Sequence, residues 1–161
     1  MSQPRILALF VKLCRWPAGD RLFSRLACFK APYFNTIRPR ITVLEPGRCV
    51  ATMRDRRAVR NHLGTVHAIA MCNLAELAGG LMTDATIPSS MRWIPKGMSV
   101  DYLKKAEGPL CATATPSGNV IASDTGYDLP VSVDIRDQSG ESVFRASIRM
   151  WVSPRRSRPA N

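Results

Sequence analysis

Two adjoining segments decide the fold: the loop NHLGTVH at residues 61–67 and the run AIAMCNLAELAGGLM at residues 68–82. The second is rich in Ala, Leu and Met, which are strong helix formers, so it predicts a helix over residues 67–83. This helix is nearly all apolar, which indicates that it is buried on several sides. We expect Gly79-Gly80 to weaken the helix locally near its end.

Strand patterns flank this helix on both sides. Residues 41–54 alternate around the turn Glu45-Pro46-Gly47-Arg48, which predicts a β-hairpin. After the helix come four predicted strands: Met91–Tyr102 (interrupted by Pro95-Lys96-Gly97), Leu110–Thr115, Tyr127–Asp137 and Glu141–Val152. In the last strand Phe144, Ala146, Ile148 and Met150 are predicted to face the core, and Val143, Arg145, Ser147 and Arg149 the solvent. The order predicts an α+β fold in which an antiparallel sheet closes around one central helix.

Residues 4–35 have the spacing of two amphipathic helices, separated at Trp16-Pro17-Ala18-Gly19 and ended by Pro32. Such a basic hairpin either packs on the domain or touches a membrane surface, and we favour packing. The predicted organisation is a helical extension at residues 1–36, one domain at residues 37–153 and a basic flexible tail at residues 154–161.

The charge is the unusual bulk feature. Lys and Arg total 23 against 12 acidic residues, which gives a net charge of +11. This surplus favours polyanionic partners such as nucleic acid, anionic lipid or a phosphate-rich small molecule. Aromatic residues make up only 7% and mostly lie away from the Arg clusters, so no nucleic-acid partner is expected. Coenzyme A fits a basic surface equally well.

The cysteines indicate no metal site. Cys14, Cys28, Cys49, Cys72 and Cys111 form no CxxC pair and no Cys/His ligand spacing, so we expect no metal and no cofactor. Reduced thiols point to a reducing compartment. The apolar run at residues 6–11 is too short for a bilayer span and lacks a signal-peptide cleavage pattern, which predicts a cytoplasmic location.

Glu76 stands out because it lies on the apolar helix. A buried carboxylate costs several kcal/mol unless it is paired, hydrated or protonated. Glu76 therefore either reaches solvent or an Arg, or it faces a seam of small residues and serves chemistry. The helix start at His67-Ala68-Ile69 offers unpaired N–H groups that bind a polarised oxygen. At 1.5 Å per residue these groups lie roughly 13 Å from Glu76, so a shared site requires two antiparallel helices in a dimer.

The spacing of Asn61, Gly64, His67 and Glu76 resembles that of PaaI-like hot-dog thioesterases, and is most similar to the DUF4442 group. That pattern has an Asn, a His-Gly-Gly six residues later, and an Ala-Asp or Ala-Glu at the helix centre. The resemblance covers roughly residues 38–152. It implies a hot-dog fold, a homodimer or dimer of dimers, and hydrolysis of thioesters carried by CoA or an acyl carrier protein.

The resemblance also implies roles for single residues. Glu76 would be the nucleophile or the general base, Asn61 would orient the water or the thioester, and the Ala68 N–H would polarise the carbonyl. His67, Ile69 and Gly64 would form part of the substrate-binding site. For His67, capping of the loop is an equal interpretation. The sequence departs from the pattern where His-Gly-Gly becomes His67-Ala68-Ile69, which narrows the approach to the acyl group.

Three functions follow from these features. The favoured one is an acyl-CoA thioesterase, whose CoA phosphates would be bound by Arg57, Arg60 or Lys104-Lys105. The alternative is a non-catalytic hot-dog protein that binds acyl-CoA or lipid, which the altered helix start favours. Nucleic-acid binding through the basic surface is third.

Overall fold

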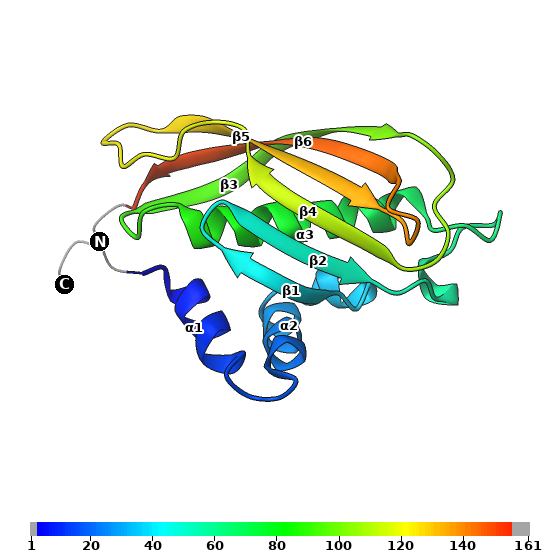
Figure 1. Ribbon diagram of the computed structural model, residues 1–161. Helices are drawn as coiled ribbons and strands as arrows, with labels where there is room; N and C mark the ends of the chain where they lie inside the picture. The colour runs from blue at the N-terminus through cyan, green and yellow to red at the C-terminus, as the bar shows by residue number, and fades with distance from the viewer. Residues whose placement is uncertain (1–2, 156–161) are drawn as a thin grey trace.

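The computed structural model describes residues 3–155, in which helices come first and strands surround a third, longer helix (Figure 1). The elements are α1 (Arg5–Leu13), α2 (Gly19–Lys30), the 3-10 helix η1 (Pro32–Thr36), β1 (Arg40–Glu45), β2 (Arg48–Met53), the 3-10 helix η2 (Arg57–Val59), α3 (Ala68–Thr86), β3 (Met91–Tyr102), β4 (Leu110–Pro116), β5 (Tyr127–Arg136) and β6 (Ser142–Pro154). The predicted hairpin and the four later strands are confirmed, with ends that agree within two residues.

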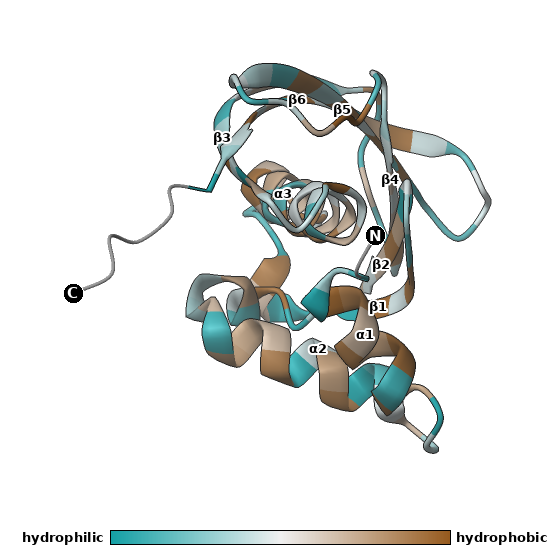
Figure 2. Cartoon of the chain, turned by 90° about the vertical axis from the view of Figure 1, so that its left-hand side faces the viewer, coloured by the Kyte–Doolittle hydropathy of each residue, from teal (hydrophilic) through white to brown (hydrophobic). Residues whose placement is uncertain are grey.

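The six strands form one antiparallel sheet in the order β1-β2-β4-β5-β6-β3. The sheet curves over α3, which lies on its concave side (Figure 2). The predicted α+β arrangement, a sheet wrapped around one central helix, is therefore confirmed. Strands β1 and β3 form the two edges, so the strand that directly follows α3 has a free edge.

Helix α3 packs tightly on the sheet through its two glycines. A Cβ on Gly79 would lie 2.9 Å from Ile148 Cδ1, and a Cβ on Gly80 would lie 2.8 Å from the Trp93 ring. Helix α3 continues through both glycines to Thr86, beyond the predicted end at residue 83, and the local weakening remains a prediction. Burial against the sheet outweighs the glycine penalty of about 1 kcal/mol per residue.

Two strands deviate from simple alternation. The register of β3 against β6 shifts between Pro95 and Gly97, so the predicted interruption is a bulge and the strand continues. In β6, Val143 is fully buried although it was predicted to face solvent. Val143 belongs to the buried core cluster, and its carbonyl accepts the Leu103 N–H at 3.0 Å, which continues the β3–β6 pairing by one residue.

The N-terminal hairpin packs on the domain, as we expected. Phe10 and Phe23 meet edge to face with 5.0 Å between ring centroids, and both join the core. Ser24 Oγ accepts the Ile41 N–H at 2.9 Å, which fixes α2 on β1. Among the described residues, no helix has the length and apolarity needed to cross a membrane. The domain boundaries remain a prediction, and residues 156–161 of the predicted tail lie outside the described residues.

Candidate active site

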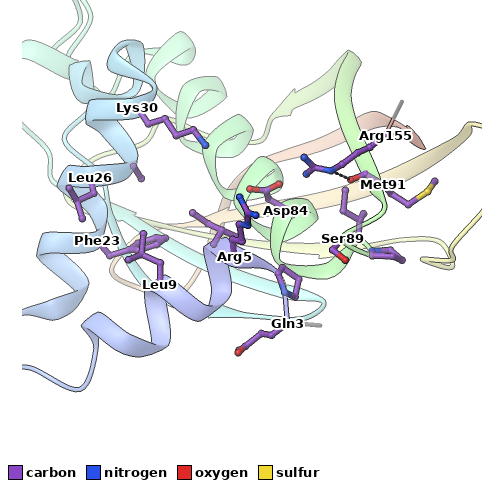
Figure 3. Close-up of a pocket in the computed structure, with 15 residues that line it drawn as sticks. Gln3, Arg5, Leu9, Phe23, Leu26, Lys30, Asp84, Ser89, Met91 and Arg155 are labelled. Atoms are coloured by element: carbon purple, nitrogen blue, oxygen red, sulfur yellow. Dashed lines mark hydrogen bonds between the residues drawn. The ribbon is translucent and has the colours of Figure 1, made fainter. Parts of the chain in front are cut away.

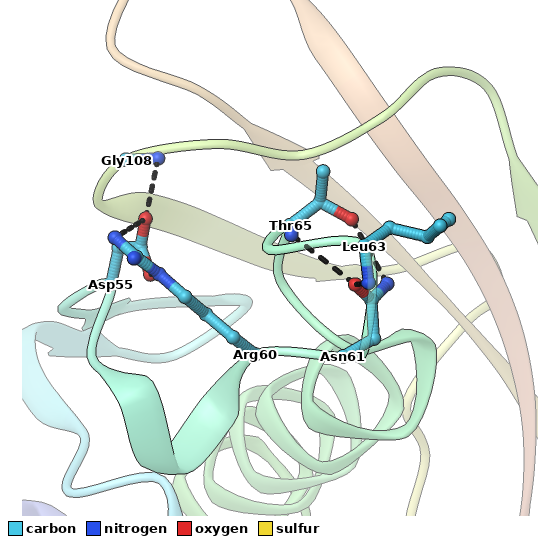
Figure 4. Close-up of polar contacts among 6 residues, drawn as sticks. All are labelled: Asp55, Arg60, Asn61, Leu63, Thr65 and Gly108. Atoms are coloured by element: carbon cyan, nitrogen blue, oxygen red, sulfur yellow. Dashed lines mark hydrogen bonds and ion pairs between the residues drawn. The ribbon is translucent and has the colours of Figure 1, made fainter.

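The loop before α3 is held by an ion pair. Asp55 binds Arg60 through two contacts, Nε–Oδ1 at 2.7 Å and Nη2–Oδ2 at 3.0 Å, and Oδ2 also accepts the Gly108 N–H at 3.1 Å (Figure 4). The Arg60 guanidinium lowers the pKa of the Asp55 carboxyl, which keeps the pair charged. The pair ties the loop to the β3–β4 connection.

Backbone hydrogen bonds fix the last residues before the helix. The Val66 N–H donates to the Ala106 carbonyl and the His67 N–H donates to the Val59 carbonyl, both at 2.8 Å. The start of α3 is thus held from two sides, which is the preorganisation that a reactive backbone group requires.

Asn61 closes the turn inside this loop. Its Oδ1 accepts the N–H groups of Leu63 at 2.9 Å and Thr65 at 3.2 Å, and its Nδ2 donates to Thr65 Oγ1 at 2.9 Å (Figure 4). Gly64 has a φ of +81°, a conformation that side-chain-bearing residues rarely adopt. The structure therefore gives Asn61 and Gly64 a loop-forming role, and one Nδ2 hydrogen of Asn61 has no acceptor among the described residues.

His67 caps α3 with its side chain. Its Nδ1 accepts the Ile69 N–H at 3.0 Å, so Nδ1 carries no proton in this arrangement. The Ile69 N–H therefore already has an acceptor and is not available to a substrate. By contrast, the N–H of Ala68, the first helical residue, has no acceptor within residues 3–155. The cap thus leaves the backbone N–H of Ala68 as a free donor at the helix start, within the described chain. Ala68 is the residue whose N–H, by the resemblance, would polarise the carbonyl.

His67→Ala is expected to destabilise the fold by about 1 kcal/mol, because the Ile69 N–H loses its acceptor. His67→Asn restores a capping side chain and should recover most of that loss. Urea denaturation of the two variants measures the difference. Equal stability of His67→Ala and the wild type would contradict the capping role, and low activity of a stable His67→Asn would show a contact with substrate.

Glu76 lies on the side of α3 that faces the free edge of the sheet. It is exposed and forms no ion pair among the described residues. It lines a cavity of about 270 Å³ together with Ile148 and the bulged segment of β3, residues 95–98. Of the expected alternatives, the Glu76 side chain reaches solvent, and a pairing with an Arg is not observed among residues 3–155. The carboxylate is available to a substrate or a partner.

The predicted seam of small residues is wrong for the most part. Asn73, Gly79 and Gly80 are buried, and the glycines face the sheet and Trp93. Of the four residues expected to form this seam beside Glu76 (Cys72, Asn73, Gly79 and Gly80), only Cys72 is not buried. Its Sγ lies 3.3 Å from Tyr102 Oη, and this hydrogen bond, with burial, raises the pKa of Tyr102 to about 12. A neutral Tyr102 hydroxyl therefore borders the open side of α3 at physiological pH.

Two of the basic residues predicted for CoA phosphates are already paired. Arg60 binds Asp55, and Lys104 binds Asp137 at 2.8 Å and also Glu141. Arg57 and Lys105 are exposed and have no ion pair among residues 3–155. The two Lys104 pairs were invisible in sequence because their acidic partners lie in the distant β5–β6 turn. In the described part of the chain, no cluster of His, Cys, Asp and Glu could hold a metal ion.

Comparison with known proteins supports the fold. The model of DUF4442, a domain of unknown function, matches residues 19–152. A crystal structure of a genomics target is 42% identical over 93% of this chain and 98% of its own, with a TM-score of 0.79. No curated protein matches the sequence.

More distant structures share the architecture. A thioesterase of Haemophilus influenzae is 16% identical over 80% of this chain and 87% of its own, with a TM-score of 0.68. A thioesterase family protein of Silicibacter pomeroyi is 17% identical over 86% of this chain and 100% of its own, with a TM-score of 0.69. At these identities the likeness concerns the fold, and the predicted hot-dog fold is confirmed.

Proposed function

The chain belongs to the DUF4442 family of hot-dog proteins, and on that basis we propose that it hydrolyses acyl-CoA-type thioesters. One observation carries the proposal: within residues 3–155, the Ala68 N–H at the start of α3 has no acceptor and the Glu76 carboxylate has no ion-pair partner. A backbone donor and a carboxylate base are the two groups that thioester hydrolysis needs, and no metal is required. The thioesterase names of distant structures with the same fold agree with this function.

The two groups serve one carbonyl only if they come from different subunits. Ala68 and Glu76 are eight residues apart, so about 12 Å of helix separates them. The edge strand β3 is 12 residues long and, among the strands of the described chain, pairs with β6 alone. Its Ile94 side chain is 60% exposed. An unpaired edge of this length is a template for another strand, and we infer an antiparallel β3–β3 dimer.

This dimer places the two sites symmetrically. The two-fold axis runs perpendicular to the shared sheet, so the two α3 helices lie antiparallel on one side of it. The N-terminus of α3 in one subunit then lies near the middle of α3 in the partner subunit. Two equivalent sites result, each with Ala68 of one subunit and Glu76 of its partner. Association of two such dimers into a tetramer is compatible with this pairing.

The chemistry follows from the two groups. Glu76 accepts a proton from a water molecule as that water attacks the thioester carbonyl carbon. The negative charge that develops on the carbonyl oxygen is stabilised by the Ala68 N–H at the positive end of α3. When the tetrahedral intermediate collapses, the C–S bond breaks and the thiolate takes the proton from Glu76. The products are a carboxylic acid and a thiol.

A second candidate is non-catalytic binding of acyl-CoA. It is favoured by the His67 cap, because the cap uses the Ile69 N–H and leaves only the Ala68 N–H of these two as a donor for substrate. It is also favoured by the Ile69 side chain, which is 54% exposed and lies beside that donor. Release of free thiol from short, medium and long acyl-CoA separates the two functions. Turnover supports the thioesterase, whereas saturable binding without turnover supports the second candidate. Neither binding nor turnover on any acyl-CoA would contradict both.

A further inference from the structure

The outer side of the helical hairpin carries a surface that the proposed active site does not use. More than half of the large exposed hydrophobic side chains in the described residues lie on α1, α2, the loop between them and η1: Leu9, Val11, Trp16, Leu22, Leu26, Phe29 and Tyr33. Phe29 is 88% exposed and Trp16 is 73% exposed. Single exposed apolar residues are ordinary, but a cluster of this kind marks an interaction site.

Helix α2 is apolar on two opposite sides. Phe23, Cys28 and the partly buried Ala27 lie on the side that packs on the domain. At 3.6 residues per turn, Leu22 and Phe29 point away from it, whereas Leu26 lies between the two sides and lines a cavity together with Phe23. The hairpin lies on the far side of α3 from strands β5 and β6 (Figure 1). The outer stripe therefore projects from the molecule, and the described chain does not cover it.

The charge around this stripe is positive. Lys12, Arg15, Arg21, Arg25 and Lys30 are exposed on the hairpin, and none of them forms an ion pair in residues 3–155. The single acidic residue in the first 35, Asp20, is bound to Arg40. We call these five basic residues, together with Trp16, Leu22, Leu26 and Phe29, the hairpin surface.

The positive region continues into a neighbouring hollow. A cavity of about 870 Å³ lies between the hairpin, the end of α3 and the start of β3 (Figure 3). Leu26 and Lys30 of the hairpin surface border it, and Arg5 and Arg155 add two further cations. The one acidic lining residue, Asp84, accepts the Trp93 indole N–H at 3.2 Å.

We propose that the hairpin surface docks on the surface of an anionic phospholipid bilayer. Trp16, Leu22 and Phe29 enter the interfacial region, where aromatic and aliphatic groups of amphipathic helices reside. The flanking Lys and Arg side chains contact the phosphates, and each contributes to attraction by a negative leaflet. A second copy of the chain fits this surface poorly, because it would bring two sets of unpaired cations face to face.

The dimer proposed above would strengthen this attachment. Its two-fold axis is perpendicular to the shared sheet, and both hairpins lie on the helix side of that sheet. The two hairpin surfaces of one dimer therefore face the same bilayer, and the second contact becomes intramolecular. This two-point attachment rests on the proposed dimer, whereas the docking itself does not depend on thioester hydrolysis.

Co-sedimentation with vesicles tests the docking. The full chain is expected to bind vesicles of phosphatidylcholine with phosphatidylglycerol at low salt, and to be released as rising salt shortens the screening length. Leu22→Gln with Phe29→Gln should weaken binding at least about tenfold, because two interfacial anchors are lost. The matched control is Ile121→Gln, an exposed apolar residue in the β4–β5 connection, which should bind like the wild type.

The charges and the insertion are tested separately. Arg21→Gln with Arg25→Gln should weaken binding, whereas Arg145→Gln with Arg149→Gln on the exposed side of β6 should not. Wild-type tryptophan emission should shift to shorter wavelength on vesicles, and Trp16→Phe should remove most of that shift. Equal binding to pure phosphatidylcholine, or no effect of the Leu22/Phe29 pair, would overturn the proposal. Concentration-dependent self-association that this pair abolishes would overturn it in favour of a second copy.

Discussion

Glu76→Gln is expected to lower kcat/KM for thioester hydrolysis about 10³-fold, because an amide cannot accept the proton of the attacking water. The substitution keeps the size of the side chain. Glu76 is exposed and unpaired in the described chain, so the stability should change by less than about 0.5 kcal/mol. The measurement is steady-state turnover of acyl-CoA together with urea denaturation of the same variant.

Glu45→Gln is the matched control. Glu45 is an exposed carboxylate in the β1–β2 hairpin, 3.6 Å from Arg48, and takes no part in the proposed site. Its turnover should equal that of the wild type. If Glu76→Gln retains full activity on substrates that the wild type hydrolyses, the catalytic assignment of Glu76 is wrong even though the chain is a thioesterase.

Ala68→Pro is expected to lower kcat about 10²-fold or more, because it removes the N–H at the helix start that has no acceptor within residues 3–155. The first position of a helix accepts proline without loss of an intrahelical hydrogen bond. The preceding residue must be extended, and His67 already has φ −67° and ψ 137°. The fold should therefore survive, and the change should fall on kcat rather than on stability.

Ala68→Ser separates the donor from the side chain. Serine keeps the backbone N–H and adds one oxygen at the same position, so it should retain most of the activity. Activity of Ala68→Pro close to that of Ala68→Ser would show that the amide does not contact the carbonyl oxygen. Loss in both variants would point instead to crowding beside Ile69.

The fold was predictable because local patterns agreed with it. Alternation defined the hairpin and β6, and the Ala- and Leu-rich run defined α3. The errors arose from contacts distant in sequence. Val143 lies in the buried core cluster beside the end of β3, and Lys104 is paired with Asp137 and Glu141 of the β5–β6 turn. No local pattern reports those contacts.

The candidate site was predictable in position and less so in chemistry. The spacing of Asn61, His67 and Glu76 located the loop and the helix. It did not show that the Asn61 side chain accepts hydrogen bonds inside its own loop. Nor did it show that His67 accepts the Ile69 N–H, so that the Ala68 N–H remains available. Hydrogen bonds of this kind depend on backbone angles, which the residue types alone do not specify.

The central claim is that each site combines Ala68 of one subunit with Glu76 of the other. It is tested by mixing inactive Glu76→Gln and Ala68→Pro proteins under conditions that exchange subunits. A mixed dimer then contains one site with both groups intact, and random exchange should restore about a quarter of the wild-type rate. No recovery, with mixed dimers demonstrated by mass spectrometry, would contradict a site shared between subunits.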